Sequence, residues 1–155
     1  MRSRLLIVLF ASMILLVVNA LGQASAAGAP ASPVGRWRTV DDATGKEKSV
    51  VVIWEENNKL HGKIEKLLYH NPNNPNSLCL HCEGELKDKP LIGLRILWDL
   101  KPDGTQWSGG RILDPDNGKI YRCNLAVEDG GKKLKVRGFI GFSLIGRTQY
   151  WLPEE

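Results

Sequence analysis

Short segments of alternating apolar and polar residues recur about every 12 to 15 positions from residue 34 onward, separated by turn residues. This pattern is typical of half-buried β-strands, because successive side chains of a strand point to opposite faces. Eight strands are expected, over residues 34–40, 49–54, 59–68, 93–100, 105–113, 119–127, 132–140 and 147–152. Gly109-Gly110 predicts a bulge in the fifth of them. No segment predicts a long helix.

Tight turns join most of these strands, which favours an up-and-down arrangement of neighbours. Eight antiparallel strands close into a barrel, and closure removes exposed sheet edges. We therefore expect an all-β fold, an eight-stranded antiparallel up-and-down barrel. A two-sheet sandwich is the alternative, but it needs crossing connections that such short turns do not supply.

One long segment, residues 69–91, interrupts the rhythm. Its Tyr-His-Asn-Pro-Asn-Asn-Pro-Asn-Ser sequence sustains neither helix nor strand. Loops of this length in a small domain are usually functional or covalently tied. We expect it to lie beside one end of the barrel, as a lid held by Cys79 and Cys82.

The chain begins with the pattern of a secretory signal peptide. A basic start (Arg2, Arg4) precedes an apolar run over residues 5–21 and a cleavage signal at Ala24-Ser25-Ala26. The interpretation is a signal peptide at 1–26, a flexible linker at 27–33 and a barrel domain at 34–155. An uncleaved anchor is the alternative. Cleavage predicts a periplasmic or secreted protein with no stable membrane anchor.

Charge adds little to this picture. The signal segment holds two of the 21 Lys and Arg residues, which leaves 19 basic against 17 acidic side chains. Lysines and arginines are scattered among acids rather than clustered, so no nucleic-acid partner is expected.

The three cysteines allow several chemistries. Cys79-x-x-Cys82 predicts a small disulfide, which an exported protein can form. A redox pair is the second interpretation, although Glu83 to Pro90 is a poor helix for activating a thiol. Zinc is the third, with His70 and His81 as further ligands. Cys123 is in phase with apolar neighbours and is expected to be buried and unpaired, although pairing with either of the other two stays open.

Other side chains suggest no reaction. His61 is expected on the outer face in solvent, and no catalytic triad, carboxylate pair or phosphate loop stands out, so no enzyme activity, cofactor or metal is predicted. The tryptophans fit either a packed core or an aromatic-lined ligand cavity. They are Trp37, Trp54, Trp98, Trp107 and Trp151.

The two ends of the barrel region carry a resemblance. Gly35-x-Trp37 and Arg147 resemble the end-locking signature of lipocalin-type barrels, in which the arginine stacks over the tryptophan across the barrel floor. A set of further motifs resembles a family of secreted bacterial proteins, domain of unknown function 2147. These motifs are Gly35-x-Trp37-x-Thr39, Asp42-x-x-Thr44-Gly45, Leu60-x-Gly62-Lys63-Ile64, Cys79-x-x-Cys82-x-Gly84, Gly109-Gly110-x-Ile112-x-Asp114-Pro115, Gly118-Lys119-x-Tyr121, Val136-Arg137-Gly138 and Gly146-Arg147-Thr148-Gln149.

This resemblance implies a lipocalin-like barrel in the bacterial envelope and no established reaction. The hypothesis is a non-enzymatic barrel that binds a small apolar, lipid-like or amphipathic ligand. One alternative is a structural or interaction module whose barrel is filled by side chains. The other is a thiol redox or metal-binding protein that uses the loop of Cys79 and Cys82.

Overall fold

The protein is described by a computed structural model that covers residues 30–155. The signal peptide predicted at 1–26 and the start of the linker lie outside these described residues. Eight strands form the domain: β1 (Gly35–Val40), β2 (Glu47–Glu56), β3 (Lys59–Leu67), β4 (Arg95–Asp103), β5 (Gln106–Asp114), β6 (Lys119–Glu128), β7 (Lys133–Phe139) and β8 (Gly146–Pro153). Two 3₁₀ helices, η1 (Gly84–Leu86) and η2 (Asp129–Gly131), lie between strands. Among residues 30–155, no helix has the length and apolar character needed to cross a membrane.

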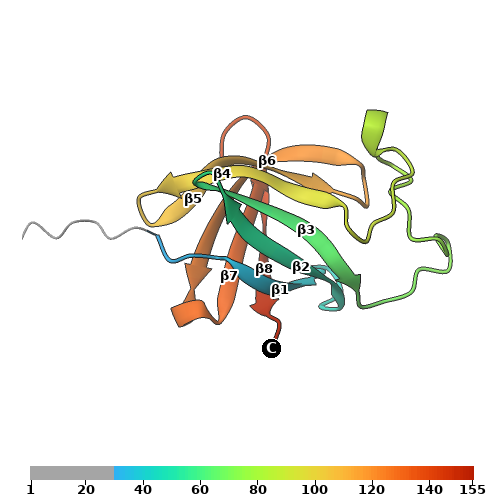
Figure 1. Ribbon diagram of the computed structural model, residues 1–155, viewed down its shortest axis with the longest axis horizontal. Helices are drawn as coiled ribbons and strands as arrows, with labels where there is room; N and C mark the ends of the chain where they lie inside the picture. Colours follow the sequence, from blue (N-terminus) through green and yellow to red (C-terminus); the bar gives the residue numbers. More distant parts are fainter. Residues whose placement is uncertain (1–29) are drawn as a thin grey trace, which may run out of the picture.

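The strands form a closed antiparallel barrel in sequence order, which confirms the predicted fold (Figure 1). Each strand pairs with the next, and β1 completes the ring by pairing with β8. That seam is short, since only Trp37↔Pro153 and Arg38↔Leu152 are in register. The Arg38 guanidinium reinforces it by donating to the Pro153 carbonyl at 3.2 and 3.3 Å and by pairing with Glu154 at 3.3 Å.

One end of the barrel is closed by two tryptophans and the chain that precedes β1. The Trp37 indole donates to the Pro33 carbonyl at 2.8 Å, and the Trp107 indole donates to the Ala31 carbonyl at 3.1 Å. Pro33 is fully buried. Pro33 and the Ala31 carbonyl therefore contact the barrel floor, whereas Ala31 and Ser32 are themselves exposed.

Arg147 does not take part in this floor. Trp37 lies opposite Pro153, whereas Arg147 is six residues earlier in β8, about 20 Å away along the strand. The Arg147 guanidinium instead forms an ion pair with Asp42, with Nε donating to Oδ2 at 2.6 Å. The predicted stacking of Arg147 over Trp37 is wrong. Gly35 and Trp37 lie in β1 as expected, but Arg147 lies at the opposite, open end.

Bulges let the sheet curve into a ring. The β5–β6 register shifts between Trp107 and Gly110, and Gly109 has φ +73°, as the glycine pair predicted. A side chain at Gly110 would collide with the Trp98 carbonyl oxygen, so β4 can approach closely only because this residue is glycine.

Candidate functional site

The barrel encloses a cavity of about 410 Å³ that opens at the end away from Trp37. All eight strands contribute residues to its walls, together with Leu91 of the long loop. The apolar lining residues are Ile64, Leu67, Leu91, Ile96, Ile112, Leu113, Val136, Phe139 and Trp151. Gly138 also lines the cavity, and a Cβ there would be in ordinary contact with Ile112 and Tyr121 at 3.6 Å. The interior is therefore not filled by side chains.

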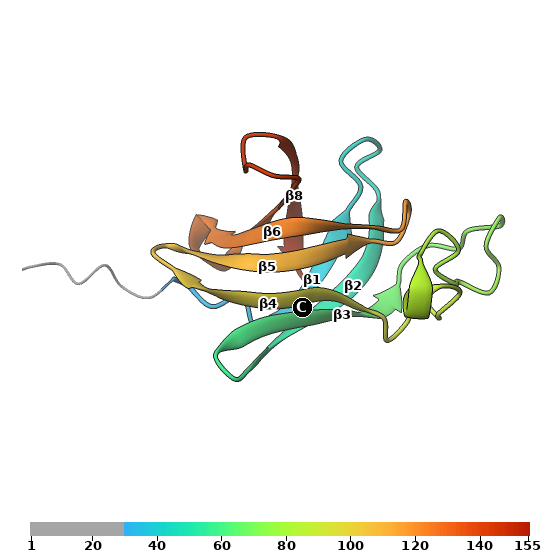
Figure 2. The same cartoon turned by 90° about the horizontal axis from the view of Figure 1, so that it is seen from above.

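Four connections surround the opening: the β1–β2 loop, the long β3–β4 loop, the β5–β6 turn and the β7–β8 loop. Figure 2 shows the β3–β4 loop, in green, extending from the barrel on the side opposite the β4–β5 turn. This places the loop beside the open end, as predicted. Of the five tryptophans, only Trp151 lines the cavity. Trp37 and Trp107 lie in the floor, Trp98 packs against the core, and Trp54 packs with Arg95 at 5.2 Å and Lys63 at 6.0 Å.

An ion pair between Lys48 and Asp116 joins β2 to the β5–β6 turn at the rim. The Lys48 ammonium group also lies 6.0 Å from the centre of the Tyr69 ring. Burial lowers the pKa of Lys48, but the hydrogen bond and charge of Asp116 outweigh burial and leave this pKa raised. Lys48 therefore carries a positive charge at the mouth of a cavity whose interior is mostly apolar.

A second ion pair, between Arg147 and Asp42, joins β8 to the β1–β2 loop. The same loop is shaped by Asp41, whose Oδ1 accepts hydrogen bonds from the Thr44 hydroxyl and backbone N–H, both at 2.8 Å. The hydrogen bonds from Thr44 lower the pKa of the Asp41 carboxyl, so it is ionised at neutral pH. Two opposite-charge pairs thus flank the opening.

Neutral polar groups complete the rim. The Asn117 amide donates to Asp114 Oδ2 at 3.0 Å and to the Tyr121 hydroxyl at 3.1 Å. Across the opening, the Thr39 and Ser49 hydroxyls lie 2.8 Å apart. These groups can donate to or accept from a polar end of a ligand whose apolar part lies deeper.

The predicted Cys79–Cys82 disulfide is present, and both residues are buried. Its turn packs against the β5–β6 turn at Gly118, where a Cβ would collide with the His81 carbonyl and lie 2.9 Å from the Cys82 nitrogen. Gly118 also has φ +73°, a conformation that favours glycine. The turn closed by the disulfide therefore packs the long loop against the rim of the cavity.

The remaining candidates are separate from the cavity. Cys123 is fully buried and unpaired, as expected, and burial raises the pKa of its thiol. His61 is only 8% exposed and lies against Trp54, with ring centres 5.8 Å apart, so its predicted solvent exposure is wrong. Register shifts on both sides of Gly62 change the alternation of β3 there. Within residues 30–155, no three His, Cys, Asp or Glu side chains are grouped for a metal.

The rim pairs were not predicted from the sequence. Lys48 directly precedes the apolar strand expected at 49–54, and Asp116 belongs to a turn that any hairpin could use. Charged residues flank most turns of the chain, so the sequence does not single out the turns at the rim. Which turns meet, however, depends on barrel closure.

Comparison with known proteins agrees with this geometry. The structure is similar to one described as "Protein HP1028 from the human pathogen Helicobacter pylori belongs to the lipocalin family", with a TM-score of 0.69, 20% identity, and coverage of 80% of this chain and 84% of that chain. This similarity shows a shared lipocalin-like fold. A comparison with curated proteins finds no significant match. The sequence profile of one family matches residues 35–152, so the chain belongs to the family described as "Uncharacterized protein conserved in bacteria (DUF2147)".

Proposed function

We propose that this protein is an exported, non-enzymatic binding barrel for a small amphipathic molecule. The open cavity of about 410 Å³ is the observation that carries the proposal. Ligand sites are typically concave, mostly apolar and about 300–1,000 Å³ in volume, with a few polar groups that fix orientation. Both the size and the lining of this cavity meet that description.

The distribution of polar groups defines how a ligand would lie. Its apolar body packs against Ile112, Val136 and Trp151, and each buried methylene contributes about 0.8 kcal/mol. Its polar end stays at the rim, between the Lys48–Asp116 and Arg147–Asp42 pairs. Because each rim pair contains both signs, it can reorganise around an anionic or a dipolar end group.

Two features support a location in the bacterial envelope. The pattern of residues 1–26 predicts export, and the Cys79–Cys82 disulfide is compatible with an oxidising compartment.

The buried position of the disulfide favours a structural role over thiol exchange, because exchange requires access to a sulfur atom. The cavity likewise favours ligand binding over an interaction module with a filled barrel.

The experiment is to fill the cavity with one side chain. Ile112→Trp adds bulk beside Gly138 and inside the lining, whereas Ile120→Trp adds the same bulk at an exposed position and serves as control. Binding is measured by the fluorescence of an anilinonaphthalene sulfonate, an apolar probe with an anionic group. We expect Ile112→Trp to weaken binding at least ten-fold and Ile120→Trp to leave it unchanged. Equal binding by both folded variants would refute the proposal.

A further inference from the structure

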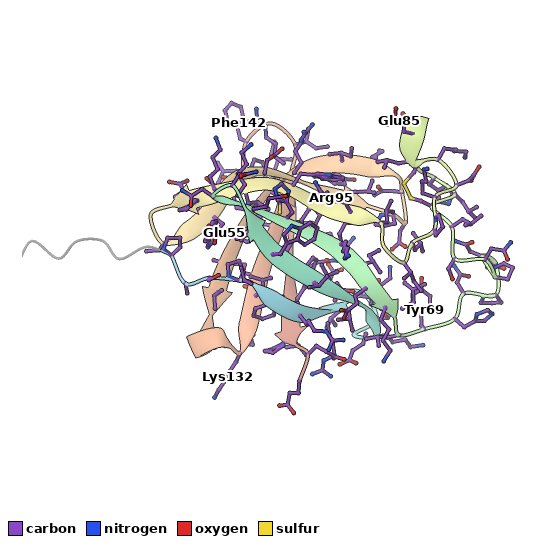
Figure 3. The ribbon with its side chains drawn as sticks, viewed as in Figure 1. Glu55, Tyr69, Glu85, Arg95, Lys132 and Phe142 are labelled. Carbon is purple, nitrogen blue, oxygen red and sulfur yellow. A yellow bond between two sulfur atoms is a disulfide. The ribbon has the colours of Figure 1, made fainter. Side chains whose placement is uncertain are left out.

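The β7–β8 loop exposes an unusual group of large apolar side chains. Ile140, Phe142, Leu144 and Ile145 are 66%, 80%, 91% and 71% exposed. The other short loops at the opening, 41–46 and 114–118, consist mainly of polar residues and glycine. Figures 1 and 2 both show the β7–β8 loop projecting from the barrel wall, and Phe142 lies on this projection in Figure 3. Contiguous exposed apolar groups of this kind mark sites of interaction.

The backbone of this loop is held in place by arginines. The Arg137 guanidinium donates to the Ser143 carbonyl at 2.7 Å and the Leu144 carbonyl at 3.3 Å. Arg122 donates to the Gly141 carbonyl at 3.3 Å. The apolar side chains are therefore presented outward from an ordered turn rather than folded back onto the barrel.

The same arginines leave positive charge beside the apolar tip. Among the described residues, neither Arg122 nor Arg137 has a carboxylate within 4.0 Å. Arg111 lies directly opposite Arg122 in the β5–β6 register and reaches its nearest carboxylate, Asp99, only at 4.0 Å. Like charges opposite one another destabilise a sheet. An anionic partner would remove this repulsion.

An apolar tip with a cationic border matches the chemistry of an anionic lipid surface. Apolar side chains enter the boundary between headgroups and acyl chains, and arginines stay among the anionic headgroups. A protein partner fits less well, because stable protein interfaces bury about 800 Å² on each partner, and a six-residue projecting loop is narrow.

We propose that the β7–β8 loop docks the barrel on an anionic membrane surface. Ile140 and Ile145 also line the cavity, so docking brings the opening next to the lipid. An amphipathic molecule could then pass between bilayer and cavity with little exposure to water. The docking itself does not depend on a ligand and is tested separately from the proposed binding function.

The test is sedimentation with vesicles of phosphatidylglycerol or of phosphatidylcholine. Protein is expressed from the complete chain and isolated from the periplasm, and parent and variants are compared only as chains shown by mass to begin at residue 27. We expect binding to phosphatidylglycerol that salt weakens, and much weaker binding to phosphatidylcholine. Phe142→Ser with Leu144→Ser should reduce binding at least ten-fold. Both side chains project into solvent, so the fold is preserved.

The charge contribution is measured at Arg122. Arg122→Gln should weaken binding about five-fold, the equivalent of about 1 kcal/mol per cation, and Arg122→Lys should restore it. Ile92→Ser, in an exposed apolar position of another loop, and Lys101→Gln, an exposed cation of β4, are the matched controls and should have no effect. Three results would each overturn the proposal: equal binding to both lipids, no binding by the parent, or a dimer that the Phe142→Ser/Leu144→Ser variant abolishes.

Discussion

Replacing Gly118 by alanine should displace the disulfide turn from the β5–β6 turn. Gly118 has φ +73°, and a Cβ at this position points at the backbone of His81 and Cys82. Both neighbours are main-chain atoms of a turn closed by the Cys79–Cys82 bond, so they cannot move aside by a simple side-chain rotation. The turn as a whole must shift.

The magnitude follows from a comparison with Gly45. Gly45 has a similar φ of +69°, but a Cβ there meets no atom within 4 Å. The left-handed conformation costs an alanine about 1–2 kcal/mol, and the reduced freedom of the unfolded chain offsets about 0.4–1 kcal/mol. Gly45→Ala should therefore lose about 1 kcal/mol. Gly118→Ala adds about 1–3 kcal/mol of steric displacement and should lose about 2–4 kcal/mol in total.

Urea denaturation of both variants measures this difference. Limited trypsin digestion adds a local readout, because displacement of the loop makes the bond after Lys87 more accessible to cleavage before global unfolding. Equal losses of stability in Gly118→Ala and Gly45→Ala, with unchanged digestion, would refute the packing of the disulfide turn on Gly118.

Three further predictions test other parts of the structure. Replacing both Cys79 and Cys82 by alanine should lower the free energy of unfolding by about 2 kcal/mol, because the bond closes a very short loop. Urea denaturation of the parent protein with and without reductant should show the same loss. Trp37→Ala should cost about 3–5 kcal/mol, since the indole is buried in the barrel floor, and a thermal melt with no shift would contradict that placement. A hydrogen bond from Lys59 lowers the pKa of Asp99, so Asp99 stabilises the fold above its ordinary pKa of 3.8 and this contribution is lost as pH falls through the lower folded value. Carboxyl titration by NMR should show the Asp99 pKa returning toward 3.8 in Lys59→Gln. If the Asp99 pKa is unchanged in this variant, the ion pair with Lys59 is not the cause of the lowered value.

The barrel could be predicted from the sequence because each strand is a local pattern. Turn residues mark where the chain reverses, and the alternation within strands such as Lys119–Glu128 shows which face is buried. The disulfide could also be predicted, since two cysteines three residues apart in a loop are close in almost any curled conformation. These inferences needed no knowledge of contacts between distant segments.

The errors concern contacts between distant segments. The pairing of Arg147 with Trp37 rests on the resemblance to the end-locking signature of lipocalin-type barrels, yet the strand register separates them and places Arg147 against Asp42. Alternation alone predicts that His61 faces solvent, but register shifts beside Gly62 and packing against Trp54 bury it. The rim of the cavity combines residues from separate turns, which only the closed barrel brings together.

Native mass spectrometry of the protein isolated from its own envelope tests the proposed binding function most directly. The account predicts one non-covalent small-molecule adduct per chain in the parent protein, and loss of that adduct in Ile112→Trp but not in Ile120→Trp. A parent protein that has the bare polypeptide mass and takes up no amphipathic molecule on addition would contradict it.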